Sequence, residues 1–209
     1  DVFLLVNANA DTLAFDGGGG DDTLLGGDGI VDVLNVTDGL SNLVSIERVD
    51  GGTGPQNTIL GTSGADTLDF SAITVANFII DGNGGDDRIT GTGANDRIEG
   101  GAGLDRIDYS AAAIALDTTL DSTGTITVAA AAGNTDTLSG IEGILGGAGA
   151  DRLVGDGVAN ILDGGAGNDT LSGQGGNDTL GGGANTDTAD YAYVATGFTA
   201  TLASTGTAT

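Results

Sequence analysis

The 209-residue sequence contains no cysteine and no histidine, and its only basic side chains are five arginines. Without cysteine there is no disulfide and no thiol nucleophile, and without histidine there is no His-based triad or His/Cys zinc site. Without lysine there is no Schiff-base amine and no phosphate-loop lysine. Paired carboxylates could still hydrolyse glycosides, but aspartates that recur at a fixed period have no reason to form one catalytic pair. We therefore expect that the protein is not an enzyme.

Aromatic residues and long apolar runs are also scarce. Aromatics make up 4% of the chain, whereas glycine occurs 41 times, which disfavours helices. No apolar run approaches the roughly 18 residues of a transmembrane helix. The net charge of -25 argues against a nucleic-acid partner and against an anionic membrane surface. A divalent cation is the natural partner of such a chain.

Aspartate and glycine recur on a nine-residue period. The pattern G-G-x-G-x-D-x-(apolar)-x, known from calcium-binding β-helices, fits GGGGDDTLL at 17–25 and, with one extra residue before the aspartate, GGDGIVDVL at 26–34. It returns in GTSGADTLD at 61–69 and then runs without a break over 82–108 and 146–190. Strand alternation turns the apolar eighth residue inward. That position holds Leu24, Ile89, Ile98, Ile107, Leu153, Leu162, Leu171 and Leu180.

A longer period is superimposed on the nonapeptides. Residues 108–127 and 190–209 align without gaps at a spacing of 82, and the aspartates before them recur at the same spacing. We therefore expect a piece of a longer repetitive protein. The predicted units are a short array with a β-rich spacer at 1–60, an array at 61–108, a β spacer at 109–145, an array at 146–190 and the start of the next spacer at 191–209.

The arrays resemble the haemolysin-type calcium-binding repeats of RTX (repeats-in-toxin) proteins, because several in-frame copies carry the apolar residue in phase. The resemblance implies an all-β fold, a right-handed parallel β-roll or β-helix with calcium in its Gly-Asp turns, interrupted by β-rich spacers. It also implies several Ca2+ ions between stacked turns, bound by aspartates of both turns and by carbonyls of the glycine turns.

Calcium prefers six to eight oxygen ligands. A glycine turn with positive φ can present carbonyls, and the sixth residue of the repeat adds a carboxylate. The candidate side-chain ligands are Asp22, Asp66, Asp87, Asp96, Asp105, Asp151, Asn160, Asp169, Asp178 and Asp187. The candidate turn glycines are Gly82, Gly84, Gly100, Gly146, Gly164, Gly173 and Gly182.

Two nonapeptides make one coil, so each turn should stack on the next but one. The predicted pairs are Asp87 with Asp105, Asp151 with Asp169, Asp169 with Asp187, and Asn160 with Asp178. The pair with Asn160 lacks one negative charge, so we expect weaker binding there. Asp96 has no obvious partner unless the degenerate stretch ITVANFIID at 73–81 supplies a turn. Asp22 and Asp66 look like ends of arrays or half-sites.

One apolar residue per strand makes a thin core, so metal binding must supply folding energy. At a free-ion concentration a thousand times its dissociation constant, each site adds about 4 kcal/mol. We therefore expect the chain to be disordered where calcium is low and to fold where it is high. The resemblance implies secretion of the unfolded chain by a type I system, to the outside or the cell surface of a Gram-negative bacterium.

Some residues outside the ligand set have two readings. Tyr109 and Tyr191 either offer a ligand-stacking surface or, as we favour, pack where an array meets a spacer. Glu47 and Glu142 either bind calcium or, as we favour, lie on the outward face of a strand. The arginines that follow calcium-type aspartates should form an outward ladder: Arg88, Arg97, Arg106 and Arg152.

Three functions remain open on the sequence. The first is a structural repeat region of an S-layer, surface fibre or adhesin, in which copies of the chain could associate in a polymer. Calcium between subunits would then use aspartates outside the arrays, such as Asp117, Asp121 and Asp136. The second is the C-terminal calcium module of a secreted enzyme (a protease, lipase or epimerase) or of a toxin. The third is a ligand-binding adhesin tip, for which a threonine ladder on one face would be the sign.

Overall fold

A computed structural model describes the backbone and side chains of residues 57–121 and 134–193, and the backbone of residues 125–131 and of six short strands nearer the N-terminus. Every regular element among these residues is a strand, in agreement with the glycine content. The described part has no helix with the length and apolar character of a membrane span.

The strands are short, most of them three residues long. They are β1 (Val2–Leu4), β2 (Phe15–Asp16), β3 (Thr23–Leu25), β4 (Val33–Asn35), β5 (Leu43–Val44), β6 (Arg48–Asp50), β7 (Asn57–Leu60), β8 (Thr67–Asp69), β9 (Thr74–Ala76), β10 (Phe78–Asp81), β11 (Arg88–Thr90), β12 (Arg97–Glu99), β13 (Arg106–Asp108), β14 (Asp117–Thr119), β15 (Thr125–Ala131), β16 (Asn134–Ser139), β17 (Gly143–Leu145), β18 (Arg152–Val154), β19 (Ile161–Asp163), β20 (Thr170–Ser172), β21 (Thr179–Gly181) and β22 (Thr188–Ala189).

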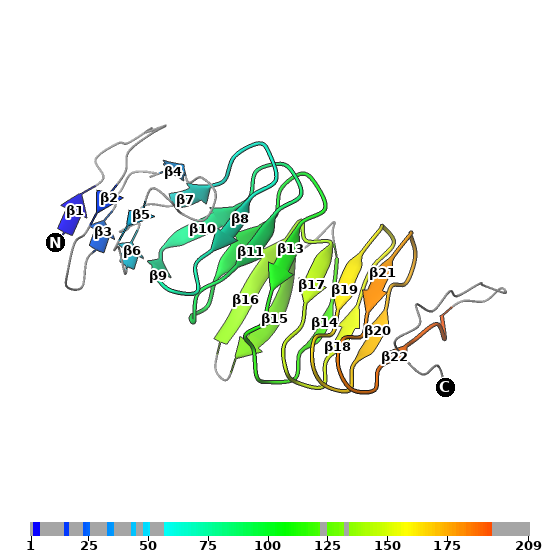
Figure 1. The fold of residues 1–209 in the computed structure, drawn as a ribbon. Coiled ribbons are helices and arrows are strands. Elements are labelled where there is room, and N and C mark those ends of the chain that lie inside the picture. Colours follow the sequence, from blue (N-terminus) through cyan, green and yellow to red (C-terminus); the bar gives the residue numbers. More distant parts are fainter. Residues whose placement is uncertain are drawn as a thin grey trace.

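These strands form parallel sheets along one elongated stack, with β1 near one end and β22 near the other (Figure 1). The long sheet has the order β21-β19-β17-β13-β11-β8. Two partner sheets share a core with it, the first ordered β15-β16-β12-β10-β7-β4 and the second β14-β18-β20-β22. Two further sheets, β1-β3-β6-β9 with four strands and β2-β5 with two, contain most of the strands nearer the N-terminus. Among the described pairings, β15 with β16 is the antiparallel one.

Neighbouring strands within the arrays come from alternate repeats. Arg88 of β11 lies opposite Arg106 of β13, and Arg152 of β18 lies opposite Thr170 of β20, each eighteen residues along the chain. The stacking of each turn on the next but one is therefore confirmed. So is the fold class, a parallel β-solenoid of the β-roll type.

Within the arrays, the middle residue of each strand lies in the core, as the repeat pattern predicts. The middle residues of β11, β12 and β13, which are Ile89, Ile98 and Ile107, are fully buried. Leu153, Leu162 and Leu171 are at most 2% exposed, and Leu180 near the end of the stack is partly buried. Because each of these array strands contributes one such side chain, apolar burial per residue is low in the arrays. Leu24 lies outside the residues whose side chains are described.

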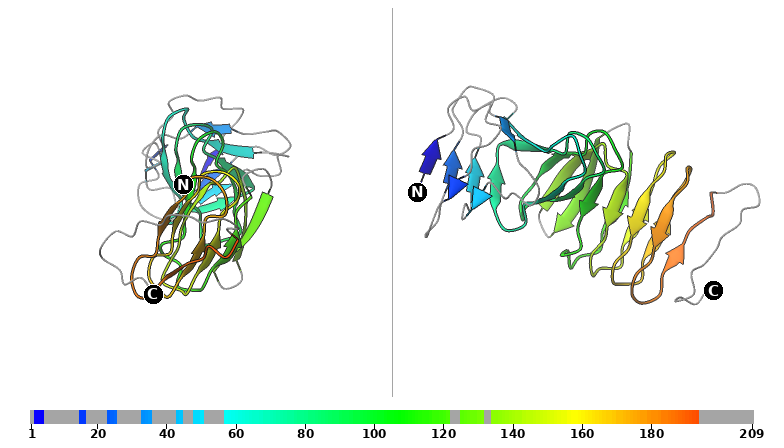
Figure 2. Two further views of the ribbon diagram at one scale, coloured as in Figure 1. Left: turned by 90° about the vertical axis from the view of Figure 1, so that its right-hand side faces the viewer. Right: turned by 45° about the horizontal axis from the view of Figure 1, so that its top comes forward.

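Buried aromatic residues lie where the run of repeats stops. Phe70 follows β8, after which the repeat pattern breaks until residue 82, and it is 0% exposed. Tyr109 follows β13, the last strand of the array at 61–108, and is 7% exposed, which supports its packing role. The chain then changes sheet: β9 follows Phe70, and β14 follows Tyr109. Strands of residues 109–145 join the long sheet and both of its partner sheets, so this stretch continues the stack. The coils from β13 onward lie largely behind one another in the end view (Figure 2).

Candidate metal centre in the aspartate turns

An acidic or amide side chain stands directly before each array strand, and these residues form hydrogen-bonded ladders along the stack. The backbone N–H of Asp87 donates to Oδ1 of Asp105 at 2.8 Å. The N–H of Asp66 donates in the same way to Oδ1 of Asp87, also at 2.8 Å. The pairs that the sequence predicts besides Asp87 with Asp105 have the same bond at 2.7 to 3.0 Å: Asp151 to Asp169, Asp169 to Asp187, and Asn160 to Asp178.

The second carboxylate oxygen of several ladder residues has no donor. Oδ2 of Asp87, Asp105 and Asp169 makes no hydrogen bond, although these residues are at most 1% exposed. A buried carboxylate oxygen without a partner is costly. A Cβ at Gly82 would clash with Oδ2 of Asp87 and would lie 2.5 Å from the carbonyl oxygen of Gly100 in the next coil. The free carboxylate oxygen and a stacked carbonyl thus border one small space, and both are ligand types that calcium prefers.

The glycines at the first position of the repeat are required by this close approach. A Cβ at Gly164, Gly173 or Gly182 would collide with the carboxylate five residues further on. At Gly100 and Gly146 a Cβ would meet a carbonyl oxygen of the next coil as well.

Positive φ, the reason for which these glycines were expected, is not what they need. None of the seven candidate turn glycines, all of which are described, has a positive φ; other glycines of the same turns do, such as Gly101 at 104° and Gly165 at 90°. Gly84 lies in ordinary contact with its partner in a parallel bridge, Ala102, at 3.7 Å from that residue's oxygen.

The turns are of two kinds, which differ in the hydrogen bond of their second residue. In a closed turn this residue donates a hydrogen bond to the carboxylate, or in one turn to the amide oxygen of Asn160. The N–H of Thr62 donates to Oδ2 of Asp66 at 2.6 Å, and its hydroxyl donates to Oδ1 at 2.9 Å. Thr92 caps Asp96 in the same way, at 2.7 and 2.9 Å. Two further closed turns have the backbone bond: Gly147 to Asp151 at 3.1 Å, and Asp156 to Asn160 at 2.8 Å.

In an open turn the second residue has a positive φ. The N–H of Asn83 donates to Asp81 at 2.8 Å, and that of Gly165 donates to Asp163 at 3.2 Å, so neither caps the carboxylate of its own turn. The second residues of the open turns are Asn83, Gly101, Gly165, Gln174 and Gly183. Their carboxylates are Asp87, Asp105, Asp169, Asp178 and Asp187, and the three oxygens without a donor belong to this set.

A family profile described as the RTX calcium-binding nonapeptide repeat matches four segments of the chain, residues 15–30, 81–111, 132–158 and 155–189. Together they span just over half of the sequence. The chain belongs to this family. All five open-turn carboxylates of the RTX arrays lie within the matched segments, whereas the closed turn of Asp66 lies outside them. A search of curated proteins finds no match.

The electrostatics of the RTX turns favour a bound cation. Burial, with a smaller contribution from nearby carboxylates such as Glu142 beside Asp105, raises the pKa of the Asp87 and Asp105 carboxyls to about 6. Burial also raises the pKa of Asp169 and of Asp178. A divalent ion would stabilise the charged form of each carboxyl.

Carboxylates alone do not make a metal centre in the described RTX arrays. No three acidic side chains gather there into a group able to hold a metal ion. An ion would have to draw the rest of its ligands from the backbone. Stacked glycine carbonyls such as those of Gly100 and Gly164 border the turns and can supply them.

Two ladder residues escaped the sequence reasoning, and one of them is Asp136. The N–H of Asp96 donates to Oδ1 of Asp136 at 3.0 Å, so Asp96 has a partner forty residues away. The stretch 73–81 does place β10 beside β12, but Phe78 stands where an aspartate would be needed. Asp136 is 2% exposed and accepts a 2.9 Å bond from the Tyr109 hydroxyl. It therefore faces the interior and is not placed to hold calcium between subunits.

The other is Glu142. The prediction that it faces outward from a strand is wrong, because it lies directly before β17 and its Oε2 accepts the N–H of Asp105 at 3.0 Å. Only the pairing of β13 with β17 across the spacer reveals this position. Asp22 and Glu47 lie outside the described residues.

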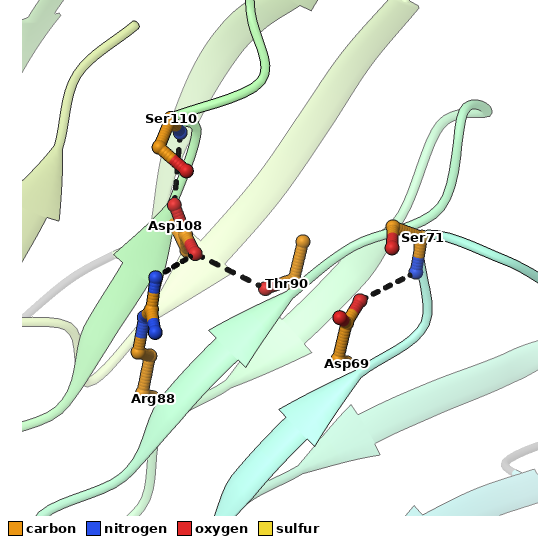
Figure 3. A network of polar contacts seen from close by, with 6 residues as sticks. All are labelled: Asp69, Ser71, Arg88, Thr90, Asp108 and Ser110. Carbon is orange, nitrogen blue, oxygen red and sulfur yellow. Dashed lines mark hydrogen bonds and ion pairs between the residues drawn. The ribbon is translucent and has the colours of Figure 1, made fainter. Parts of the chain in front are cut away.

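Arginines of the RTX arrays face outward, as predicted. Arg88 donates to Oδ2 of Asp108 on the neighbouring strand at 2.5 Å, and the N–H of Ser110 donates to the other oxygen (Figure 3). Burial alone would raise the pKa of Asp108, but these two partners bring it below its ordinary value. The other pairs are Arg97 with Glu99 and Arg152 with Asp117. The three arginines are 42% to 56% exposed, so each pair contributes little stability.

Proposed function

We propose that the chain is a calcium-dependent structural repeat region of an extracellular bacterial protein, such as an S-layer, a surface fibre or an adhesin, and that it folds on calcium after secretion. The observation that carries the calcium dependence is the set of buried carboxylate oxygens without a donor in the open turns. Calcium would be held by Asp87, Asp105, Asp169, Asp178 and Asp187, together with carbonyls of the stacked turns.

The energetics support folding that depends on the ion. The net charge is -25, and the array strands place only their middle side chain in the core. The calcium-free chain therefore has strong self-repulsion and little apolar burial to oppose it. Calcium adds its binding free energy to the folded state alone, because the turns that supply its ligands exist only there. The typical secretion of RTX proteins by Gram-negative bacteria would bring the chain to a compartment rich in calcium.

A structural role is favoured over a module attached to an enzyme by the 82-residue repetition and by the way the stretch 109–145 continues the stack. A C-terminal calcium module of a secreted enzyme or toxin is the alternative. The full sequence of the parent protein separates the two, because repeated further units support the first and a catalytic domain supports the second.

An adhesin tip with a threonine ladder gains no support from the long sheet. In the long sheet the outward column that begins at Thr67 and ends at Thr179 passes through two arginines, a glycine and an isoleucine.

A calcium titration of the whole chain tests the proposal. Far-UV circular dichroism and hydrodynamic radius are followed together, with magnesium as the control. We expect a cooperative change from an expanded chain to a compact β structure with calcium and none with magnesium. A chain that is already folded in chelator and unchanged by calcium would overturn the proposal. A radius that keeps increasing with protein concentration in calcium would support assembly into a polymer.

A further inference from the structure

We propose that Asp105, Glu142 and the carbonyl of Gly140 form a calcium site. The site would lie where the spacer at 109–145 stacks on the array at 61–108. This inference rests on the proposed calcium-dependent function. Its new element is a ligand pair that is not on the nine-residue period, with a glutamate in place of the repeat aspartate.

Strand register puts Glu142 in an aspartate position. Arg106 of β13 lies opposite Gly143 of β17, so the residues just before these strands, Asp105 and Glu142, are stacked neighbours. Asp87 and Asp105 are related in the same way one coil earlier, through Arg88 and Arg106. The ladder bond is also the same, at 3.0 Å to Glu142 and 2.8 Å to Asp105.

The glutamate side chain compensates for a shorter turn. Six residues separate β12 from β13, whereas Gly140, Ile141 and Glu142 alone separate β16 from β17. The extra methylene of glutamate lets its carboxylate accept the same backbone N–H from this tighter turn. Gly140 has a φ of 60°, and its carbonyl oxygen lies against Gly100. One coil earlier, the carbonyl oxygen of Gly100 lies against Gly82 in the same way.

Asp105 supplies the observation that points to an ion. Asp105 is 0% exposed, and its Oδ2 has no hydrogen-bond partner. A Cβ built on Gly100 would meet this Oδ2 at 2.9 Å and the Gly140 carbonyl at a still shorter distance, so the two oxygens border the same space. The negative charge of Glu142 next to it makes a cation the fitting ligand.

The other contact across the spacer is built differently. Asp96 and Asp136 are also stacked. However, Thr92 donates to the carboxylate of Asp96, and the Tyr109 hydroxyl donates to Oδ2 of Asp136. Protein donors already satisfy the carboxylates of the pair Asp96 and Asp136, so this pair needs no ion. Of the two stacked acidic pairs across the spacer, Asp105 with Glu142 is therefore the one that calcium would bind.

The test counts calcium ions on the whole chain by native mass spectrometry at saturating calcium. We expect Glu142→Gln to bind one ion fewer than the wild type, and Glu142→Asp to bind intermediate amounts, because it keeps the charge on a shorter side chain. The matched control is Glu99→Gln, which removes an outward glutamate paired with Arg97 and should leave the count unchanged. A full ion count in a folded Glu142→Gln variant would overturn this site while the proposed function stands. A wild type that binds no calcium would overturn the proposed function itself.

A second measurement does not depend on the variant folding. Anomalous scattering from calcium in crystals of the wild-type chain shows whether an ion lies within ligand distance of both Asp105 and Glu142. An ion there supports the proposal. Ions at Asp87 and Asp169 with none at Glu142 would refute it.

Discussion

The backbone N–H of Asp87 donates a 2.8 Å hydrogen bond to Oδ1 of Asp105, and Oδ2 of both residues remains buried without a donor. One oxygen of each carboxylate therefore holds the coils together, and the other is available to a ligand. Asp96 differs, because Thr92 donates to both of its carboxylate oxygens.

This difference predicts that the same substitution weakens calcium binding in one turn of the array and leaves it unchanged in another. Asp87→Asn removes an anionic ligand and should weaken calcium binding at its turn about tenfold or more, which is ~1.4 kcal/mol per factor of ten. Asp96→Asn should leave the number of bound ions and their affinities unchanged. Isothermal titration of the two variants measures both quantities, and equal losses would show that open and closed turns do not differ in calcium binding.

The raised pKa values of Asp87 and Asp105 predict an unusual pH dependence of the calcium-free chain. Their folded pKa of about 6 exceeds the ordinary 3.8, so between these values the folded state binds more protons than the unfolded state. The free energy of unfolding should therefore increase as the pH falls from about 7 towards 4, and this gain is lost as the pH rises through about 6.

Calcium reverses this pH preference, because protons compete for the same oxygens. Circular dichroism in chelator at about pH 7.5 and pH 5, repeated with calcium, measures the pH dependence of the fold without and with the ion. We expect more β structure at the lower pH in chelator and a weaker calcium affinity there. A calcium-free chain that loses structure on acidification over this range would contradict the assignment.

Two glycines of one array should respond in opposite directions to alanine. Gly165 has φ of 90°, and a Cβ there would come 2.5 Å from the Gly147 oxygen, so Gly165→Ala should destabilise the calcium-bound fold by about 1–3 kcal/mol or more. Gly157 has no atom within 4 Å of such a Cβ, and Gly157→Ala should be neutral or stabilise by up to about 1 kcal/mol. Urea unfolding in saturating calcium compares them, and similar losses would refute the close approach at Gly165.

The buried pair of Tyr109 and Asp136 should be a structural bond that does not depend on calcium. Tyr109→Phe leaves Oδ2 of Asp136 without its 2.9 Å donor, at a cost of about 1–3 kcal/mol in the free energy of unfolding. Tyr193→Phe is the control, since Tyr193 is 38% exposed and should change stability by less than about 0.5 kcal/mol. Chemical unfolding gives the stabilities, and calcium titration should show an unchanged ion count in both variants. A lost ion in Tyr109→Phe would contradict the bond's independence of calcium.

Much of the fold could be predicted from local pattern. A nine-residue period with one apolar residue in phase specifies strand length, the inward side chain and the spacing of stacked neighbours, as Ile89 and Ile107 show. The ladder partners within an array follow, because Asp87 and Asp105 are two repeats apart. These features depend on residues close together in the chain, so a single sequence contains them.

The ladder residues of the spacer could not be predicted from local pattern. Asp136 and Glu142 enter the ladders only because β16 lies beside β12 and β17 beside β13, forty and thirty-seven residues along the chain. The aromatic residues at the array ends gave a partial signal: Tyr109 could be recognised as a packing residue, but its hydroxyl partner Asp136 could not.

The sequence alone thus determined the repeat, the solenoid class, the inward apolar file and the set of candidate calcium carboxylates, because each is a property of nine or eighteen consecutive residues. Only the tertiary structure decided which of those carboxylates are capped by their own turns and which residues continue the ladders across the spacer. Both depend on which backbone N–H groups and carbonyls the stacking of distant strands brings within hydrogen-bond distance.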